Sequence, residues 1–175
     1  MKKIKTADIA TVSLGAALMC ICSWIQIPSA IPFTLQTFAL FFIATALGFK
    51  KSLAATVVYI FLGAVGLPVF SGFQGGIGAL MGATGGFILA FIPASVIVSL
   101  TCKKFGKGVV STSVCCLAGL FVCYAAGVLW YSFVYGGGKL LSGFFVCVLP
   151  FIIPDIAKIL LAATVSKRIK PIINK

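Results

Sequence analysis

"ALFFIATALGFKKSLAATVVYIFLGA" (residues 39–64) sets two long apolar runs on either side of two adjacent lysines. Charged side chains are costly in the hydrocarbon of a bilayer and are readily solvated at its surface. We therefore interpret Lys50 and Lys51 as a turn at the water face between two membrane-embedded helices. The same pattern also fits a single hairpin that dips into the bilayer and returns, and this alternative stays open.

The composition of the whole chain supports the same environment. Its 175 residues are 61% hydrophobic, and the mean hydropathy is +1.21. A soluble domain of this length has no room to bury so much apolar surface, so we predict an all-α membrane protein with one domain over residues 1–175. The basic start continues into an apolar run that reaches Ile27, which predicts a first span rather than a cleaved signal peptide.

The apolar runs resolve into a bundle of six predicted transmembrane helices, separated by lysine, proline and glycine. The second, third and fourth runs are shorter than the roughly 20 residues that a straight spanning helix needs. We expect neighbouring helices to bury these three, or the helices to extend into the adjoining loops. The predicted segments cover residues 8–27, 35–49, 52–67, 85–101, 109–134 and 141–165.

Basic residues fall almost entirely at alternate ends of these segments. Lys139 alone lies at the opposite set of ends, and Lys158 lies inside the last segment. The asymmetry predicts that both termini are cytoplasmic, and it explains the net charge of +12 by topology and contact with anionic lipid rather than by nucleic-acid binding. The basic residues on the predicted cytoplasmic side are Lys2, Lys3, Lys5, Lys50, Lys51, Lys103, Lys104, Lys107, Lys167, Arg168, Lys170 and Lys175.

Two further site classes receive no support from the sequence. The chain has seven cysteines and no histidine, and most of the cysteines lie in apolar runs without zinc-type spacing, so we expect packed thiols and no metal site. "GGGKLL" (136–141) is not a nucleotide-binding loop, because Phe133 stands in place of the leading glycine and Leu140 in place of the serine or threonine.

Two loops on the predicted outer side have unusual composition. In "IPSAIPFTLQ" (27–36), Pro28 and Pro32 disfavour helix and favour an extended path. The second, "GLPVFSGFQGGIGALMGATGG" (66–86), is rich in glycine and contains aromatic residues. Such a loop can fold over apolar surface and bring backbone amides close to a ligand.

The glycines of the second loop also fit a purely structural interpretation. Gly78, Gly82 and Gly86 recur every four residues, which is the spacing of a close contact between helices. This interpretation is compatible with a ligand-binding loop, and the sequence does not separate the two.

The last segment carries a charged pair inside apolar sequence, "FIIPDIAKILLAA" (151–163). Asp155 lies about 14 residues beyond the start of the segment, roughly 20 Å into the bilayer. Lys158 follows at i+3 on the same helical face and can neutralise it. Pro150 and Pro154 predict a kink at the pair. Intramembrane charges usually face a bundle interior and mark a polar site. The alternative is that Asp155 and Lys158 only neutralise each other and bind no ligand.

Several other polar and aromatic residues are available to line a pocket. They are distributed over the two outer loops and the fifth segment, whose tyrosines near the surface also fit an interfacial aromatic belt. A proton or ion path is disfavoured, because further acidic or histidine side chains are missing from the apolar segments. The candidates are Thr34, Gln36, Gln74, Thr84, Tyr124 and Trp130.

Three stretches resemble a known family, the BioY proteins, which are the biotin-specific S components of energy-coupling factor (ECF) vitamin transporters. They are "PFTLQT" (32–37), "FLGAVGLPVFSGFQGGIGALMGATGGFILAF" (61–91) and "PFIIPDIAK" (150–158). The resemblance runs through nearly the whole chain in order. Ala83 is a departure, because the family usually has proline there.

The resemblance implies a six-helix bundle in the bacterial plasma membrane that binds biotin near its outer face and needs no cofactor. Asp155 would accept the ureido N–H groups of biotin, and Lys158 would keep Asp155 ionised and contact the ureido oxygen or the carboxylate. Aromatic and polar loop residues would cover the rest of the ligand. The implied binding set also includes Thr34, Gln36, Phe70, Phe73, Gln74, Gly76, Gly78, Thr84, Gly85, Tyr124 and Trp130.

The resemblance also implies partner proteins: a transmembrane T component and two cytoplasmic ATPases. A stripe of small side chains on the first segment would permit close approach of the T component. Its members are Thr11 with Gly15 and Ser13 with Ala17. Ordinary packing within the chain is the alternative explanation for this stripe.

Other functions remain as alternatives. One alternative is a chain that acts alone as a biotin binder or transporter without the ATPases, and another is an S component for a different small vitamin. An intramembrane enzyme is disfavoured because the chain has no histidine and one embedded carboxylate. A channel is disfavoured because the predicted cytoplasmic halves of the segments are nearly pure apolar.

Overall fold

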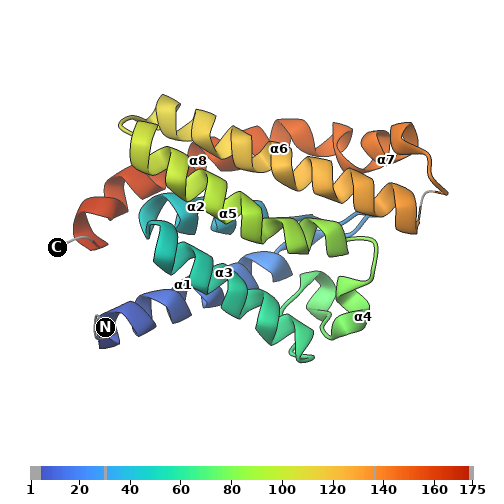
Figure 1. Ribbon diagram of the computed structural model, residues 1–175, viewed down its shortest axis with the longest axis horizontal. Coiled ribbons are helices and arrows are strands. Elements are labelled where there is room, and N and C mark those ends of the chain that lie inside the picture. The colour runs from blue at the N-terminus through green and yellow to red at the C-terminus, as the bar shows by residue number, and fades with distance from the viewer. Residues whose placement is uncertain (1–4, 30, 136, 174–175) are drawn as a thin grey trace.

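The computed structural model describes residues 5–29, 31–135 and 137–173, and most of this chain is helical (Figure 1). Two short strands, β1 (Gln26–Ile27) and β2 (Phe33–Thr34), and two 3-10 turns, η1 (Ser71–Phe73) and η2 (Leu149–Phe151), interrupt the helices. The helices are α1 (Thr6–Trp24), α2 (Gln36–Ala46), α3 (Phe49–Ala64), α4 (Ile77–Leu80), α5 (Gly85–Phe105), α6 (Val109–Val134), α7 (Leu140–Cys147) and α8 (Ile152–Ile173).

The predicted class, an all-α membrane protein, agrees with the length and composition of the helices. Within the described residues, α1, α5, α6 and the stretch Leu140–Pro171 are long and apolar enough to cross a bilayer. Helix α2 is apolar but has only 11 residues, and α3 has 16. The count of six spans and the cytoplasmic position of both termini therefore stay predictions.

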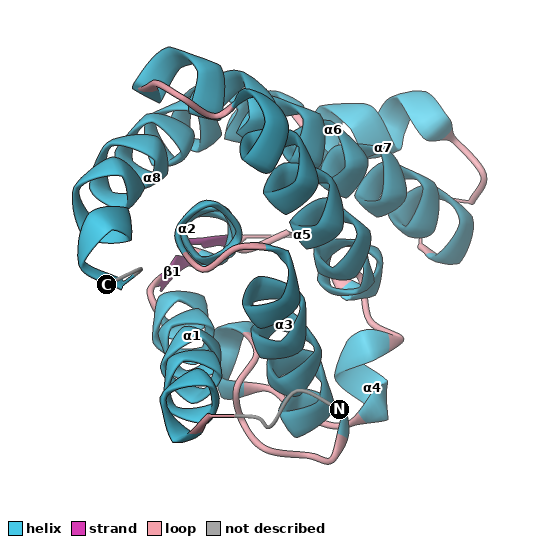
Figure 2. Cartoon of the chain, turned by 60° about the vertical axis from the view of Figure 1, so that its left-hand side comes forward, coloured by secondary structure: helices cyan, strands magenta, loops and turns pink. Residues whose placement is uncertain are grey.

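Helix α2 occupies the centre of the bundle, where α1, α3, α5 and α8 surround it (Figure 2). At about 1.5 Å per residue it is about half as long as the hydrocarbon core is thick. Its apolar residues are not confined to one side, which is typical of a helix covered all round. Ala39, Leu40 and Phe41 are fully buried, so the expected burial of this short segment by its neighbours is confirmed.

A short hairpin precedes α2. Strands β1 and β2 pair antiparallel, with Gln26 opposite Thr34 and Ile27 opposite Phe33. The extended path predicted for residues 27–36 is therefore present at these strands. The hairpin brings Thr34 next to the first turn of α2, and so it sets the entry to the centre of the bundle.

The last predicted segment is not a single helix. Helix α7 ends at Cys147, the η2 turn contains Pro150, and α8 begins at Ile152. The predicted kink at the charged pair is therefore wrong: the break precedes the pair. Pro154 lies in the first turn of α8, where a helix needs no N–H from it, so this proline starts a helix rather than bending one. Asp155 consequently lies in the first turn of α8.

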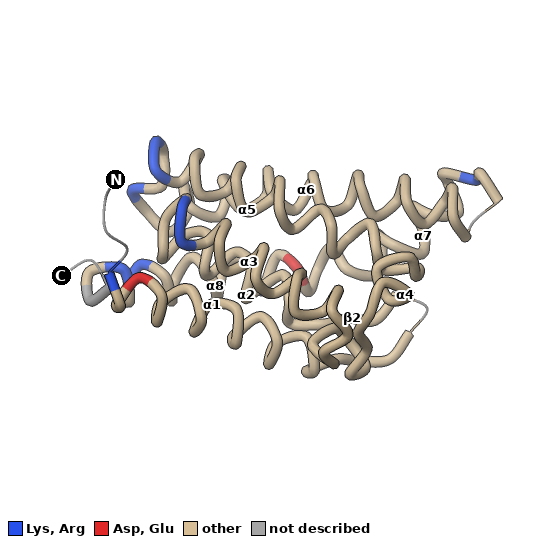
Figure 3. The backbone as a smooth tube through the Cα atoms, turned by 60° about the horizontal axis from the view of Figure 1, so that its bottom comes forward, with Lys and Arg blue, Asp and Glu red and all other residues tan. Residues whose placement is uncertain are grey.

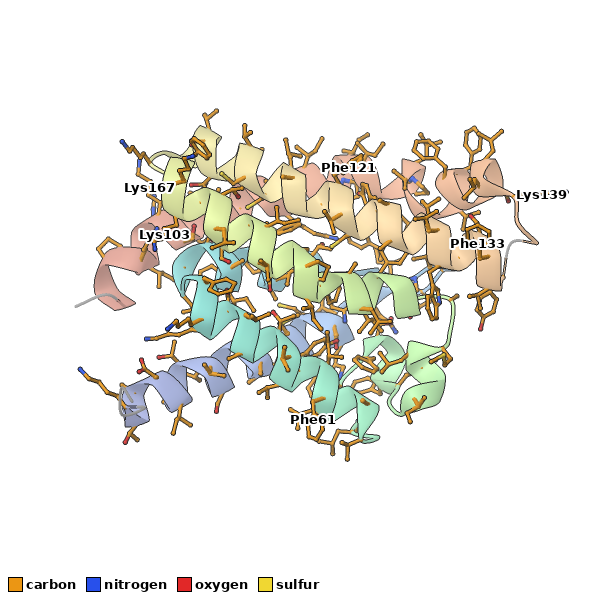
Figure 4. All side chains as sticks on the ribbon, viewed as in Figure 1. Phe61, Lys103, Phe121, Phe133, Lys139 and Lys167 are labelled. Atoms are coloured by element: carbon orange, nitrogen blue, oxygen red, sulfur yellow. The ribbon has the colours of Figure 1, made fainter. Side chains whose placement is uncertain are left out.

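Lysine and arginine gather at one end of the molecule, together with both described ends of the chain (Figure 3). Lys139 lies at the opposite end (Figure 4). This arrangement in space agrees with the alternation along the sequence. Lys2, Lys3 and Lys175 of the predicted basic set lie outside the described residues.

The glycine-rich loop is compact rather than one continuous helix. Gly78 lies in α4, Gly82 in the following turn and Gly86 in α5, so the three glycines do not share one helix, as the structural alternative for this loop required. Gly86 is the one of the three that makes a close contact, because a Cβ there would lie 2.2 Å from the Cβ of Trp130.

All seven cysteines are free and buried.

Candidate functional site

The charged pair of α8 lies in the interior of the bundle. Lys158 Nζ lies 2.7 Å from Asp155 Oδ1. Asp155 is 3% exposed and Lys158 is 6% exposed. The positive end of the α8 dipole further stabilises a carboxylate in the first helical turn. The Lys158 ammonium also lies 3.9 Å from the ring centroid of Phe33 in β2, a distance that permits a cation–π interaction.

Two other helices supply partners to the pair. Thr37, in the first turn of α2, donates a hydrogen bond to Asp155 Oδ1 at 3.0 Å and accepts one from Lys158 Nζ at 3.2 Å. Tyr124, in the middle of α6, donates to Asp155 Oδ2 at 2.6 Å. The pair therefore ties α2, α6 and α8 together at a single point.

The hydrogen-bond capacity of Asp155 is not exhausted by these contacts. An ionised carboxylate accepts about four hydrogen bonds, and Lys158, Thr37 and Tyr124 supply three. One acceptor position is left for a further donor. Asp155 and Lys158 can therefore neutralise each other and still leave one acceptor position of the carboxylate for a ligand.

Asp155 and Lys158 both face a cavity between the helices and the outer loops. The volume of this cavity that is available to the centre of a water-sized sphere is about 60 Å³. A larger outer cavity, of about 700 Å³ by the same measure, shares Pro32, Ser71 and Thr84 with it. The inner cavity is walled by Ile31, Pro32, Thr34, Gln36, Thr37, Ser71, Thr84, Phe87, Ile88, Phe91, Cys123, Tyr124, Cys147, Phe151, Asp155 and Lys158.

Most of the predicted polar residues lie in these walls. Thr34, Gln36 and Tyr124 line the inner cavity, Thr84 lines both, and Gln74 lines the outer one together with Gly78. The side chain of Gln36 is held by hydrogen bonds with Tyr59 and Thr34. These residues therefore lie around the same cavities, and their role in binding stays a prediction.

The predicted aromatic residues lie elsewhere. Phe70 is buried against Tyr59, with ring centroids 5.6 Å apart. Phe73 is 64% exposed and stacks on Trp24 at 5.3 Å. Trp130 lines neither cavity, and it donates its indole N–H to the carbonyl of Gly82 in the wall of the outer cavity at 2.9 Å. These three side chains support the loops rather than line the cavities.

Two predicted glycines act through the backbone. The amide of Gly76 donates to the carbonyl of Gly63 at 2.7 Å, which fixes the glycine-rich loop to the end of α3. Gly85 begins α5, and a Cβ there would lie 1.8 Å from the carbonyl oxygen of Leu80. Neither glycine lines a cavity.

The chain matches the model of the BioY family over residues 1–175. It belongs to the BioY family. The "Probable biotin transporter BioY" of Pyrococcus horikoshii is 37% identical over 170 residues, which cover 95% of this chain and 98% of that protein. The "Biotin transporter BioY" of Thermotoga maritima is 39% identical over 159 residues, with 88% and 90% covered.

A solved structure has the fold of this BioY-family chain. It is described as the crystal structure "of the S-component for biotin from an ECF-type ABC transporter". Its TM-score is 0.89, and the match covers 97% of this chain and 95% of that chain at 21% sequence identity. At this identity the similarity establishes the fold.

Several cavity residues of this BioY-family chain were not among the predicted site residues. Thr37 lies within the family-like stretch "PFTLQT", and its position three residues after Thr34 was the available signal. Phe33 lines neither cavity but contacts Lys158, and it precedes Thr34 in the same stretch, so the sequence offered the same signal for it. Phe151 and Ser71 carried no distinctive signal, because both are ordinary members of apolar or glycine-rich stretches.

The predicted docking residues on α1 of the BioY-family chain divide into two groups. Ser13 and Ala17 are exposed on the outer face of the helix. Gly15 is buried, and a Cβ there would lie 3.1 Å from that of Ala55. Thr11 is half-buried and donates to the carbonyl of Ala7 at 2.6 Å. Packing within the chain therefore explains Gly15, and a free face remains at Ser13 and Ala17.

Proposed function

We propose that this chain captures biotin from outside the cell and is the substrate-binding membrane subunit of an ATP-driven ECF-type uptake transporter. The observation that carries this proposal is a buried carboxylate, paired with Lys158 and with one acceptor position open, that faces a cavity below the two outer loops. Membership of the BioY family supports biotin as the ligand. The proposed role is binding and transport, not catalysis, and it needs no cofactor.

The chemistry of biotin fits this carboxylate. The ureido ring of biotin offers two N–H donors and a carbonyl oxygen, while its thiophane ring and alkyl chain are apolar. Asp155 would accept an N–H group in its open position, and a charge-assisted hydrogen bond of this kind is about twice as strong as a neutral one. The apolar rings would pack against Phe87, Phe91 and Phe151, which take the place of the aromatics expected from the sequence.

A second N–H contact to Asp155 would require an exchange of partners. Thr37 and Tyr124 occupy two of the acceptor positions with hydroxyl groups that can rotate away. Lys158 would remain as the counter-ion and its ammonium could reach the ureido oxygen. In the absence of ligand, the same hydroxyls keep the carboxylate satisfied, which explains why an intramembrane charge is tolerated here.

The shape of the two cavities suggests how a ligand enters and where its carboxylate lies. The inner cavity is too small for a whole vitamin, since typical ligand pockets have about 300–1,000 Å³. The outer cavity provides the missing volume. We expect the ring system near Asp155 and the valerate chain directed outward between Gln74 and Ser71, with some opening of the loops on entry.

The same proposal includes a transmembrane T component and two cytoplasmic ATPases. Ser13 and Ala17 support it, because their small side chains are exposed on a helix that lies at the edge of the bundle (Figure 2). Small residues permit the close helix approach that a membrane interface requires. A stand-alone biotin transporter is the alternative, and vitamin uptake by vesicles with and without the ATPases separates the two.

Calorimetry with the purified protein tests the proposed ligand directly. Biotin is titrated first, with riboflavin and thiamine as controls for other small vitamins. The proposal predicts saturable binding of one biotin per chain and no binding of the controls. A folded protein that does not bind biotin, or that binds riboflavin or thiamine instead, would contradict it.

A further inference from the structure

A further polar cavity, separate from the inner and outer cavities, lies at the lysine-rich end of the bundle. Lys167 in its wall is labelled in Figure 4. Water-sized spheres can be centred in about 250 Å³ of this cavity. Its wall combines the α5–α6 turn, the start of α6 and the last turns of α8. Lys107 comes from the turn, and Lys167 and Lys170 come from α8. The vitamin-binding role proposed above does not use this cavity.

The three lysines have no acidic side chain to neutralise them. The whole chain has two acidic side chains, and both are engaged: Asp8 pairs with Lys51 at 2.7 Å, and Asp155 pairs in the interior. Three exposed lysines therefore border a cavity that has no side-chain carboxylate in its wall. Such an arrangement attracts an anion from outside the chain.

Thr112 supplies an uncommitted donor to the same cavity. It is 9% exposed, and its hydroxyl forms no hydrogen bond with any described residue. The other two hydroxyls in the wall donate hydrogen bonds to backbone carbonyls of their own helices. Thr45 donates to the carbonyl of Phe41 at 2.8 Å, and Ser166 donates to that of Ala163 at 3.1 Å. Among the hydroxyl residues of this wall, Thr112 is thus the one whose hydroxyl has no partner among the described residues.

The N-terminus of α6 adds backbone donors. Gly108 in the cavity wall is the N-cap residue of this 26-residue helix, and no side chain caps it. The first N–H groups of a helix have no partner within the helix and favour anions, particularly phosphate. Together with Thr112 and the lysines, they form a set of donors and cations suited to a tetrahedral oxyanion.

We propose that this cavity binds a phosphate group, carried by an anionic phospholipid headgroup or by free phosphate. The lysines provide its charge neutralisation, and Thr112 with the start of α6 provides directed hydrogen bonds. Basic cavities between helices at the cytoplasmic surface suit lipid headgroups. Phe105 and Val110 flank the turn and are 56% and 79% exposed, which gives acyl chains a surface and favours the lipid source.

Native mass spectrometry of the detergent-purified protein tests this site. Dioleoyl phosphatidylglycerol is added as the anionic probe, dioleoyl phosphatidylcholine as its zwitterionic control, and inorganic phosphate as a competitor. The variants are Lys167→Gln/Lys170→Gln and Thr112→Val. Lys103→Gln/Lys104→Gln is the matched control, because it removes the same charge at the same end outside the cavity wall.

We expect saturable binding of one phosphatidylglycerol, weakened by about tenfold or more in Lys167→Gln/Lys170→Gln and by about threefold to tenfold in Thr112→Val. The control variant should keep wild-type affinity, and all variants should keep biotin binding as evidence of folding. Displacement by inorganic phosphate at equal affinity would identify free phosphate as the ligand. Absence of saturable binding by either probe would overturn the proposal, as would equal loss in the control variant.

Discussion

The substitution Asp155→Asn removes the anion on which the proposed biotin site depends while keeping the size of the side chain. A hydrogen bond to a charged group is worth about 1.5–3 kcal/mol, so loss of the charge should weaken biotin binding roughly 10- to 100-fold. Tryptophan fluorescence and calorimetry both measure this affinity. Trp24 reports on the outer loops, because it stacks on Phe73 and donates to the carbonyl of Pro68.

The same substitution also affects folding, because it leaves Lys158 buried without its counter-ion. Removing one partner of a buried ion pair typically costs about 3–5 kcal/mol. The double variant Asp155→Asn/Lys158→Met removes both charges, so it should recover much of the thermal stability without recovering biotin affinity. This separation distinguishes loss of the ligand contact from loss of the fold.

Asp8→Asn is the matched control, since Asp8 is the other acidic side chain and forms an ion pair of equal length with Lys51. That pair lies at the surface, with side chains 40% and 34% exposed. Surface pairs of this kind contribute little to stability, and this one is remote from the cavity. Wild-type biotin affinity in a folded Asp155→Asn protein, or equal losses in Asp155→Asn and Asp8→Asn, would refute the assigned role of Asp155.

Three further predictions concern other parts of the molecule. Thr37→Val should raise biotin affinity by about fivefold with the ion pair intact, because the hydroxyl that a second ureido N–H must displace from Asp155 is gone; calorimetry measures this, and a lowered affinity would contradict the proposed exchange of partners. Gly86→Ala should lower the thermal midpoint clearly, since its Cβ would overlap a neighbouring helix, whereas Gly78→Ala, with open space around it, should not; equal midpoints would show that the contact at Gly86 is unimportant. Ser13→Leu or Ala17→Leu should abolish copurification with the T component while biotin binding persists, and the docking face lies elsewhere if assembly survives.

The general architecture was accessible from hydrophobicity and charge alone. The predicted segment 109–134 coincides with α6, because a long apolar run without proline or charge has few alternatives. Asp155 and Lys158 were found for the same reason, since a charge in an apolar run is conspicuous. The basic residues predicted the end at which both described termini lie (Figure 3).

The details that arise from packing were not accessible in this way. Thr37 and Asp155 are 118 residues apart in the sequence, and they form a hydrogen bond. This contact exists because α2, at the centre of the bundle, packs against α8. The break before α8 depends on how η2 folds around Pro150, while the proline pattern alone suggested a bend at the pair. Phe70 and Phe73 had the right chemistry for a ligand cover, but the folding of the loop directed one into the core and the other toward Trp24.

The structure of the protein with biotin bound tests the central claim most directly. The account predicts a ureido nitrogen of biotin within about 3 Å of a carboxylate oxygen of Asp155, with Lys158 still beside Asp155 and the alkyl chain directed toward the outer cavity. Biotin bound elsewhere, with Asp155 still held only by Lys158, Thr37 and Tyr124, would contradict the account.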